Sequence, residues 1–319
     1  MQSTKEAYRI LCDSNPTVPL FSQYWWLDKA CGAGRWDVFI LFGKGYIRAA
    51  FPFYRPASGI ISMPAFTQTM GPWFAGETED TKYSTKIAKR QAACKEFIDL
   101  LNPYSSFLQN FHHSITDWLP FYWANFNQTT RYTYILNDIS NPDKILAAMS
   151  ANIRRNIDKA RGKHRIQVRR GIPPAELTRM VALSFERQGL KPKHLHLLPN
   201  LISEARSRNK GDIWGAYDNR NQLHAAAFVA WHGPTAYYIA GGSDPELRGS
   251  GAHSLTLWQA ILDVRDFAQE FDFEGSMLSG VERFFREFGA EQRPYFTICR
   301  GRTSIVKRIW IKLGQLWTR

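Results

Sequence analysis

One stretch of the sequence, residues 212–268, constrains the fold of this 319-residue chain more than any other feature. Three apolar, strand-like segments separated by turn-forming residues come first, at 212–217, 223–231 and 235–240. A glycine-rich loop at 241–251 then leads into a helical pattern over 252–268. Strands joined by short turns pair antiparallel, so this order predicts a meander that is followed by a helix.

The rest of the chain adds further helices and strands in mixed order. The first 140 residues contain a predicted hairpin whose turn is formed by residues 43–45, then a helix at 81–101 and strands at 106–110 and 131–136. Asn, Asp, Ser and Pro cluster at 137–142 and mark a boundary. Beyond it we expect helices at 142–161, 173–188, 197–208 and 281–288, and strands at 165–169, 271–273 and 295–299. The pattern predicts an α+β fold with a mixed, mostly antiparallel sheet, divided into residues 1–140, 141–302 and a tail at 303–319.

The composition excludes several classes of protein. No run of 18 apolar residues appears, and the N-terminal residues lack the pattern of a signal peptide, so we expect a cytoplasmic protein. Four scattered cysteines without a Cys-x-x-Cys pair predict reduced thiols and neither a zinc finger nor a thioredoxin-type site. The formal net charge of +13 indicates an anionic partner without identifying it.

The glycine-rich loop is the strongest candidate for an anion site. Its last residues, Arg248, Gly249, Ser250, Gly251 and Ala252, combine glycines that permit close backbone approach with the expected start of a helix. Unpaired N–H groups at a helix start favour a pyrophosphate. The alternative is ordinary turn chemistry. The loop matches neither a Walker loop nor a dinucleotide fingerprint.

Several short segments resemble one known family of proteins. The meander, the x-x-x-Gly-x-Gly loop at 246–251 and the following helix resemble the acyl-CoA-binding half of a GNAT acyltransferase. Other segments are similar to FemAB-like proteins, which are double-GNAT acyl- or aminoacyl-transferases of the bacterial cell envelope; these segments are residues 119–123, 131–134, 152–160, 271–276, 284–290 and 294–296.

The resemblance implies two GNAT-like domains around a cleft, with the donor in the second. It implies that residues 248–252 hold the phosphates of an acyl-CoA donor and that backbone N–H groups on strand 235–240 polarise its carbonyl, without a metal. Two positions depart from the family. Phe285 stands where many members have a lysine, and Glu246 replaces the first Gln or Arg of the loop.

Two residues are the candidates for proton transfer. Glu274 lies at a predicted strand end and is our first choice as general base, with a solvated carboxylate as the alternative. Tyr238 is the candidate proton donor to the leaving thiolate, a role that the resemblance implies, with a buried strand tyrosine as the alternative. His253, at the predicted helix start, is a weaker candidate.

Basic residues are concentrated in two segments, 150–170 and 303–319, which suggests two separate functions. Residues 150–170 hold eight Lys or Arg against one acidic residue, and Arg154 and Arg155 lie off the apolar stripe of the expected helix. With Arg283 and Arg286, they are candidates to bind an anionic acceptor or the end of a tRNA; a solvated helix face is the alternative. The tail at 303–319 predicts a basic amphipathic helix with tryptophans, suited to an anionic membrane surface or to docking on the protein itself.

A rival motif lies in the first half. His112, Ser114 and Asp117 fit H-x-S-x-x-D, in which a histidine–aspartate pair activates a glycerol hydroxyl in glycerophospholipid acyltransferases. The partner Phe-Pro-Glu-Gly block is absent, which disfavours this hypothesis.

These observations favour an acyltransferase that moves an acyl group from acyl-CoA to an amine or hydroxyl of a cell-envelope precursor (peptidoglycan, polysaccharide or lipid). The acceptor is a small or lipid-linked anion, and the protein works in the cytoplasm or on the inner face of the membrane. One alternative is a FemAB-type transferase that uses aminoacyl-tRNA. The other is an inactive basic binding protein. DNA is not an expected partner.

Overall fold

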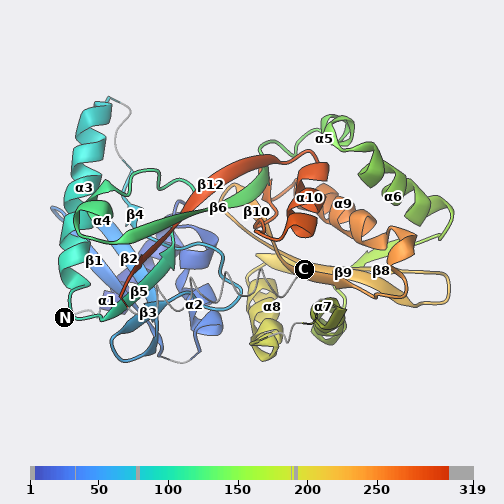
Figure 1. The fold of residues 1–319 in the computed structure, drawn as a ribbon, viewed down its shortest axis with the longest axis horizontal. Helices are drawn as coiled ribbons and strands as arrows, with labels where there is room; N and C mark the ends of the chain where they lie inside the picture. Colours follow the sequence, from blue (N-terminus) through green and yellow to red (C-terminus); the bar gives the residue numbers. More distant parts are fainter. Residues whose placement is uncertain (1–3, 33, 77–79, 188, 190–192, 302–319) are drawn as a thin grey trace. The chain divides into compact units, whose positions relative to one another are not determined.

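The computed structural model describes residues 4–32, 34–76, 80–187, 189 and 193–301 (Figure 1). Contacts divide the chain into two compact units, Met1–Arg131 with Pro294–Arg319 and Tyr132–Arg293. Two strands, β6 (Asn127–Leu136) and β12 (Glu291–Arg300), contribute residues to both units. The compact units therefore divide within strands, whereas the sequence placed boundaries at 140 and 302. The predicted tail helix at 303–319 lies outside the described residues.

The first unit is a sheet between helices. Its strands run in the order β1-β2-β3-β5-β12, with β4 beside β2. The pairs β1–β2, β2–β3, β2–β4 and β5–β12 are antiparallel, and β3 runs parallel to β5. The strands and helices that begin and end in this unit are α1 (Thr4–Ser14), α2 (Tyr24–Ala30), β1 (Trp36–Phe42), β2 (Ile47–Ala57), β3 (Ile60–Ser62), β4 (Trp73–Phe74), α3 (Tyr83–Leu100), β5 (Ser106–Asn110) and α4 (Leu119–Trp123).

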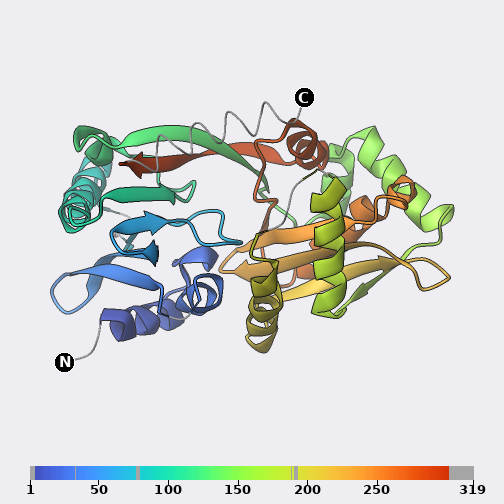
Figure 2. The same cartoon turned by 60° about the horizontal axis from the view of Figure 1, so that its bottom comes forward.

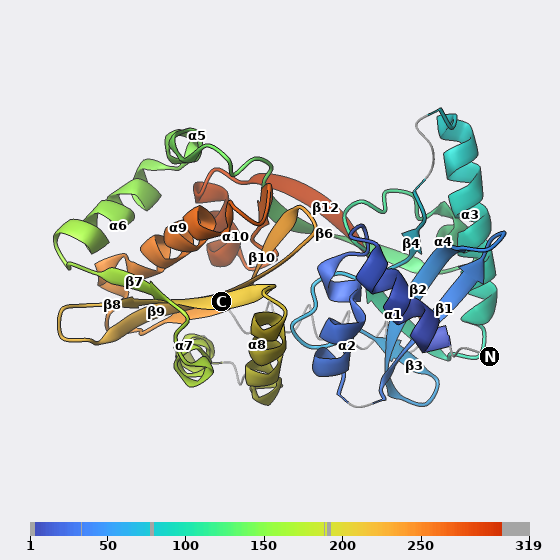
Figure 3. The same cartoon turned by 180° about the vertical axis from the view of Figure 1, so that it is seen from behind.

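Alternation along β2 explains why helices cover both faces of this sheet. Phe51 and Phe53 point into a core shared with α3, and the ring centroid of Phe51 lies 5.3 Å from that of Phe97. Ala50, which precedes Phe51 in the strand, points to the other face, where α1 packs on β1 (Figure 3). Successive side chains of a strand face opposite sides, so a run of apolar residues needs a cover on each.

The second unit repeats the layered arrangement with six strands in the order β6-β11-β10-β9-β8-β7. Strands β10 and β11 run parallel, and the pairs β6–β11, β9–β10, β8–β9 and β7–β8 are antiparallel. Helices α7 and α8 cover one face, and α6 and α9 cover the other (Figures 1 and 2). Its other elements are α5 (Pro142–Ala148), α6 (Ala151–Gly162), β7 (Gln167–Arg170), α7 (Pro174–Arg187), α8 (Leu198–Ser207), β8 (Gly211–Tyr217), β9 (Leu223–His232), β10 (Thr235–Ser243), α9 (Ala252–Val264), β11 (Glu270–Asp272) and α10 (Ser279–Glu287).

Strand β9 shows how this core is built. Every residue from Leu223 to Trp231 is buried, and small alanines occupy much of the strand. Ala225, Ala227 and Val229 pack in the core that includes α9. Small side chains on a central strand let helices approach both faces of the sheet closely.

The predicted fold class is confirmed: the chain is α+β with a mixed, mostly antiparallel sheet. One predicted helix is wrong, because residues 142–161 form two helices. Met149 is extended and Ser150 caps α6, its Oγ accepting the N–H of Ile153. The four cysteines are buried free thiols. No helix in the described ranges has both the length and the apolar character needed to cross a bilayer.

Candidate functional site

The sheet of the second unit opens beside β10. Strand β9 pairs with β10 as far as Ser243, but β11 pairs only with Thr235–Tyr237. A β-bulge shifts the register of β10 between Tyr238 and Ala240. Beyond the bulge, no strand among the described residues pairs with the edge of β10 that faces β11, and the N–H of Ser243 donates to Oγ of Ser184 at 3.1 Å.

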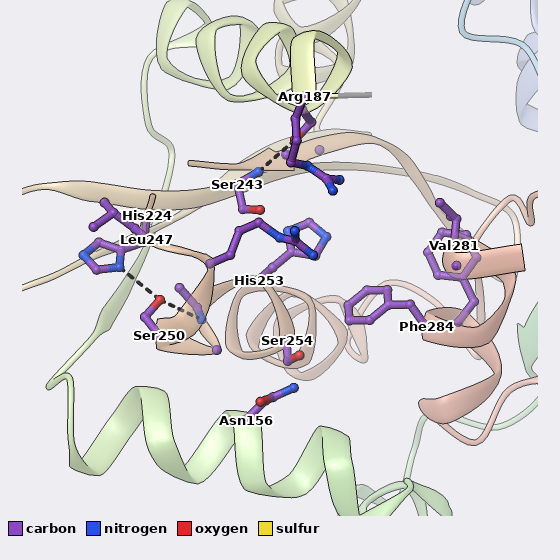
Figure 4. Close-up of a pocket in the computed structure, with 18 of the residues that line it drawn as sticks. Asn156, Arg187, His224, Ser243, Leu247, Ser250, His253, Ser254, Val281 and Phe284 are labelled. Atoms are coloured by element: carbon purple, nitrogen blue, oxygen red, sulfur yellow. Dashed lines mark hydrogen bonds between the residues drawn. The ribbon is translucent and has the colours of Figure 1, made fainter. Parts of the chain in front are cut away.

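A cavity of about 370 Å³ fills this opening. In the described residues it is lined from α6, α7, β9, β10, α9 and α10 of the second unit, and from the loop between β10 and α9. Figure 4 shows Arg187, from the end of α7, on one side and Asn156, from α6, on the opposite side. His253 and Ser254, from the start of α9, lie between them.

Two glycines bring the backbone close to the cavity. Gly251 is the N-cap of α9 with φ of +79°, and a Cβ there would collide with the backbone oxygen of Asn156. A Cβ at Gly242 would collide with the backbone oxygen of Met180. Both positions therefore require glycine, which explains the composition of the loop.

The start of α9 offers N–H groups to the cavity. Its N-cap has no side chain, and the Oγ of Ser250 accepts the N–H of Ala252 at 3.3 Å. That Oγ also pairs with Nδ1 of His224 at 3.0 Å (Figure 4). Nε2 of His224 lies 3.5 Å from Asp218. Ser250 thus links His224 to the start of α9, and the N–H groups of a first helical turn, with the positive end of the helix dipole, favour an anion.

The charge of the cavity is positive. Arg187 and Arg248 line it, and among its described lining residues none is acidic. Burial lowers the pKa of Arg187, and the positive charge of Arg248 lowers it further, so the two guanidinium groups repel each other. An anion between them would relieve that repulsion, so the site suits phosphate groups.

Tyr238 and His253 meet inside the cavity. The Tyr238 hydroxyl lies 3.4 Å from Nε2 of His253. Burial lowers the pKa of His253 to about 4, so this imidazole is neutral at pH 7. Burial and the nearby carboxyl of Glu274 raise the pKa of Tyr238, so its phenol keeps its proton. The cavity therefore holds a neutral proton donor next to a positive anion site.

Glu274 lies just beyond β11 in a left-handed conformation, with φ of +60°. Its N–H donates to Oδ1 of Asp272 at 2.7 Å, and Thr133 donates its hydroxyl to the same oxygen. Within the part of the chain that the structure describes, Oε1 of Glu274 has no hydrogen-bond partner. Burial and Asp272 raise the pKa of Glu274 well above its usual value, and burial raises that of Asp272 to about 7.

The predicted residues divide between the cavity and the surface. Tyr238, Arg248, Ser250, Gly251 and Ala252 line the cavity, whereas Gly249 does not, and Glu274 acts electrostatically on Tyr238 from just outside it.

The four candidate acceptor arginines lie outside the cavity lining. Arg154 donates to the backbone oxygens of Leu146 and Ala147, and Arg155 is exposed. Arg283 and Arg286 are exposed and pair with Glu287 and Glu282, each at 2.8 Å.

Sequence reasoning missed several lining residues. Arg187, Asn156 and Phe284 line the cavity, yet they belong to three helices far apart in the sequence. Asn156 and Phe284 lie in the segments 152–160 and 284–290 that resemble FemAB-like proteins, and Phe285 occupies the position at which many members have a lysine. Its ring is buried, 6.0 Å from that of Tyr238.

The rival motif does not form a catalytic pair. Asp117 accepts hydrogen bonds from the N–H of Leu119 and from Gln91, at 3.0 and 2.8 Å. Nδ1 of His112 pairs instead with Ser114 at 2.8 Å. The aspartate therefore does not orient the histidine, as that mechanism requires.

Comparisons with known proteins agree with the geometry. The family model of the acetyltransferase (GNAT) domain matches residues 147–286, which include the cavity. Among solved structures, FemX is similar over 93% of this chain and 96% of its own, with a TM-score of 0.67 and 13% identity.

Two further solved structures are similar along the whole chain. L-PGS from Bacillus licheniformis has a TM-score of 0.54 at 12% identity, covering 100% of this chain and 98% of that one. A conserved protein from Bacteroides thetaiotaomicron has a TM-score of 0.56 at 12% identity, covering 94% and 99%. No curated protein matches the sequence. Residues 147–286 therefore match the acetyltransferase (GNAT) domain, and the chain as a whole has a fold similar to that of FemX.

Proposed function

We propose that this protein transfers an acyl group from acyl-CoA to an amine or hydroxyl of an anionic cell-envelope precursor. The observation that carries the proposal is the cavity at the start of α9. It combines two arginines and free N–H groups with the neutral phenol of Tyr238, and no acidic side chain lines it in the described chain. A donor that ends in a pyrophosphate and carries a reactive thioester needs both features.

The proposed reaction is a direct displacement. The phosphates bind at Arg187, Arg248 and the start of α9, and N–H groups of β10 beyond the bulge polarise the thioester carbonyl. The acceptor nitrogen or oxygen attacks the carbonyl carbon, the carbon–sulfur bond breaks, and the acceptor proton passes to the ionised carboxylate of Glu274. Tyr238 gives its proton to the leaving thiolate and recovers it from solvent.

Binding of CoA tests the donor half of the proposal. Calorimetry with CoA should give saturable binding that weakens with salt, and replacing both Arg187 and Arg248 with Ala should reduce the affinity at least 100-fold, at about 1.5–3 kcal/mol for each charged hydrogen bond. Arg179→Ala is the matched control, an exposed arginine on α7 outside the cavity lining. CoA binding that is absent, or is unchanged in the double variant, contradicts the proposal.

Aminoacyl-tRNA is the second candidate donor, and the outer surface of α6 favours it. Arg155, Lys159, Arg161 and Lys163 are exposed there, and within the described residues none pairs with a carboxylate. Four charges should give salt-sensitive binding of RNA. If tRNA binds and CoA does not, the tRNA route replaces the CoA route. If neither binds, an inactive binding protein becomes the better explanation.

We further propose that the acceptor is lipid-linked and that the protein meets it at an anionic membrane surface. The positive surface of α6 and the basic tail at 303–319 are the groups that would meet an anionic, lipid-linked acceptor at the inner face of the membrane. Co-sedimentation with anionic and neutral vesicles tests this, comparing the full chain with a variant in which Lys307, Arg308, Lys312 and Arg319 are replaced by Gln. Equal sedimentation of the two proteins with anionic vesicles would exclude a membrane role for the tail.

A further inference from the structure

The cavity has two chemically different ends. His224, Leu247 and Ser250 lie at one end, beside the start of α9 (Figure 4). Val281 and Phe284, both from α10, lie at the other end, with His253 between the two groups. The anion site described above occupies the first end and leaves the second without an assigned ligand.

Aromatic rings form the wall at the α10 end. The ring of Phe284 lies 5.4 Å from His253 and 5.2 Å from Phe288. Phe285 packs beside it against Tyr238 and stacks on Phe273 at 5.2 Å. Each of these rings has its neighbours in edge, tilted or stacked contact, so the wall is held in one arrangement.

The three residues of this wall that line the cavity provide no charged or hydrogen-bonding side chain to a ligand. Val281, Phe284 and Phe285 carry no polar side-chain atom, and His253, beside Phe284, is neutral at pH 7 because burial lowers its pKa. An ammonium group placed here would meet no carboxylate among the lining residues and would share the cavity with Arg187 and Arg248. A buried charge without a partner is strongly unfavourable, whereas an alkyl or aryl group gains from leaving water.

Tyr238 connects the wall to the proposed chemistry. Its ring packs on Phe285, and its hydroxyl is the proposed proton donor to the leaving thiolate. A thioester that reacts beside Tyr238, with its phosphates at the start of α9, would direct its acyl chain toward α10.

From these contacts we infer that Val281, Phe284 and Phe285 form the acyl-group subsite and select an uncharged, apolar acyl chain over an aminoacyl group. This inference rests on the proposed function, because it takes the phosphates of CoA to bind at the other end of the cavity. It deepens that proposal by naming the class of group transferred.

Two substitutions change the size of the subsite in opposite directions. Phe284→Ala removes a half-buried ring and lengthens the subsite. Gly280→Leu adds a side chain at a lining position in α10, where a Cβ meets nothing within 4 Å, and shortens it. Phe267→Ala is the matched control, since this phenylalanine is 39% exposed and lies outside the cavity lining.

The experiment measures affinities of the full chain for CoA, for acetyl-, butanoyl-, hexanoyl- and octanoyl-CoA, and for β-alanyl-CoA, which ends in an ammonium group. We expect the affinity to rise about fourfold for each buried methylene up to an optimum length. The optimum should move to longer chains in Phe284→Ala and to shorter chains in Gly280→Leu, with CoA itself bound equally by all variants. β-Alanyl-CoA should bind no better than CoA.

Four results would overturn the inference. If CoA binds but acyl length has no effect, or if β-alanyl-CoA binds best, the subsite is wrong while the proposed donor stands. An optimum that moves equally in Phe267→Ala would show that α10 does not set the length. Failure to bind CoA at all would overturn the inference together with the proposed function.

Discussion

The two units contain the same supersecondary pattern, a strand, a helix and a second strand parallel to the first. In the first unit it is β3–α3–β5, and in the second it is β10–α9–β11. The starts of the two helices differ. Helix α9 is buried from its first residue, Ala252, whereas α3 has its buried residues in its second half, and Tyr83 at its start is 77% exposed.

This difference in burial explains why the start of α9, and not the start of α3, is the candidate anion site. N–H groups and a helix dipole are present in both helices, but at α3 water screens them. At α9 they are held inside a cavity, beside Arg187 and Arg248, where charge interactions are stronger. The supersecondary pattern is thus shared, and burial of the helix start distinguishes the candidate site.

The largest effect is expected when a side chain is added at the start of α9. Gly251→Ala should abolish CoA binding and lower the free energy of unfolding by about 2–5 kcal/mol, because the left-handed φ and the clash with Asn156 add together. Urea unfolding and calorimetry measure both effects. Gly162→Ala, at the end of α6 where a Cβ meets open space, should change neither. Normal CoA binding by Gly251→Ala would show that close approach at the loop is not needed.

The buried carboxyl group should have the next largest effect. Glu274→Gln should lower kcat by about 10²–10⁴-fold with the fold retained, as expected for loss of a general base. Glu96→Gln, on the exposed surface of α3, serves as the control and should leave kcat unchanged. Because the pKa of Glu274 is raised, its basic form accumulates only as pH rises, so kcat of the wild type should increase with pH. A kcat that falls as pH rises, or is unaffected by the substitution, would remove Glu274 from the mechanism.

The same carboxyl groups predict the pH dependence of stability. Asp272 has a pKa of about 7 in the folded protein, above its value in the unfolded chain. The folded state therefore holds its proton more tightly, and the free energy of unfolding should fall as pH rises from about 4 to 7. Asp272→Asn should reduce this fall, as measured by urea unfolding at pH 4, 5.5 and 7. An identical pH dependence in the variant would contradict the assignment.

A smaller effect is expected from two histidine–serine pairs, one in each unit. Ser250→Ala removes the hydroxyl that links His224 to the start of α9 and should weaken CoA binding about 3–10-fold, the value of one hydrogen bond. Ser114→Ala removes the comparable contact to His112 in the first unit and should leave CoA binding unchanged. Calorimetry distinguishes the two. Equal losses of CoA affinity in the two variants would show that the contact at the start of α9 has no special effect on CoA binding.

The smallest effect is expected at the start of α3. Lys82 is its N-cap and makes no side-chain cap, so Lys82→Ser should raise the free energy of unfolding by about 0.5–1 kcal/mol. CoA binding should not change, because this helix start faces water. A change in CoA affinity would show that α3 takes part in the site after all.

Local patterns in the sequence were enough to predict the helices and strands around the candidate site. Turn residues and apolar runs located β8, β9 and β10, and glycine spacing located the loop and the start of α9. These signals lie within about ten residues of each other, and local backbone preferences determine them. The break between α5 and α6 was missed, because the cap at Ser150 competes with an apolar stripe that continues across it.

The sequence by itself determined the fold class and the loop residues Arg248, Ser250, Gly251 and Ala252 at the cavity. Only the tertiary structure decided that Arg187 lines the same cavity, that Arg283 and Arg286 pair with glutamates on their own helix, and that β12 enters the first unit. The physical reason is the separation along the sequence of the residues that interact. Turns and caps are set by neighbouring residues, whereas the lining of a cavity depends on which helices pack against a sheet.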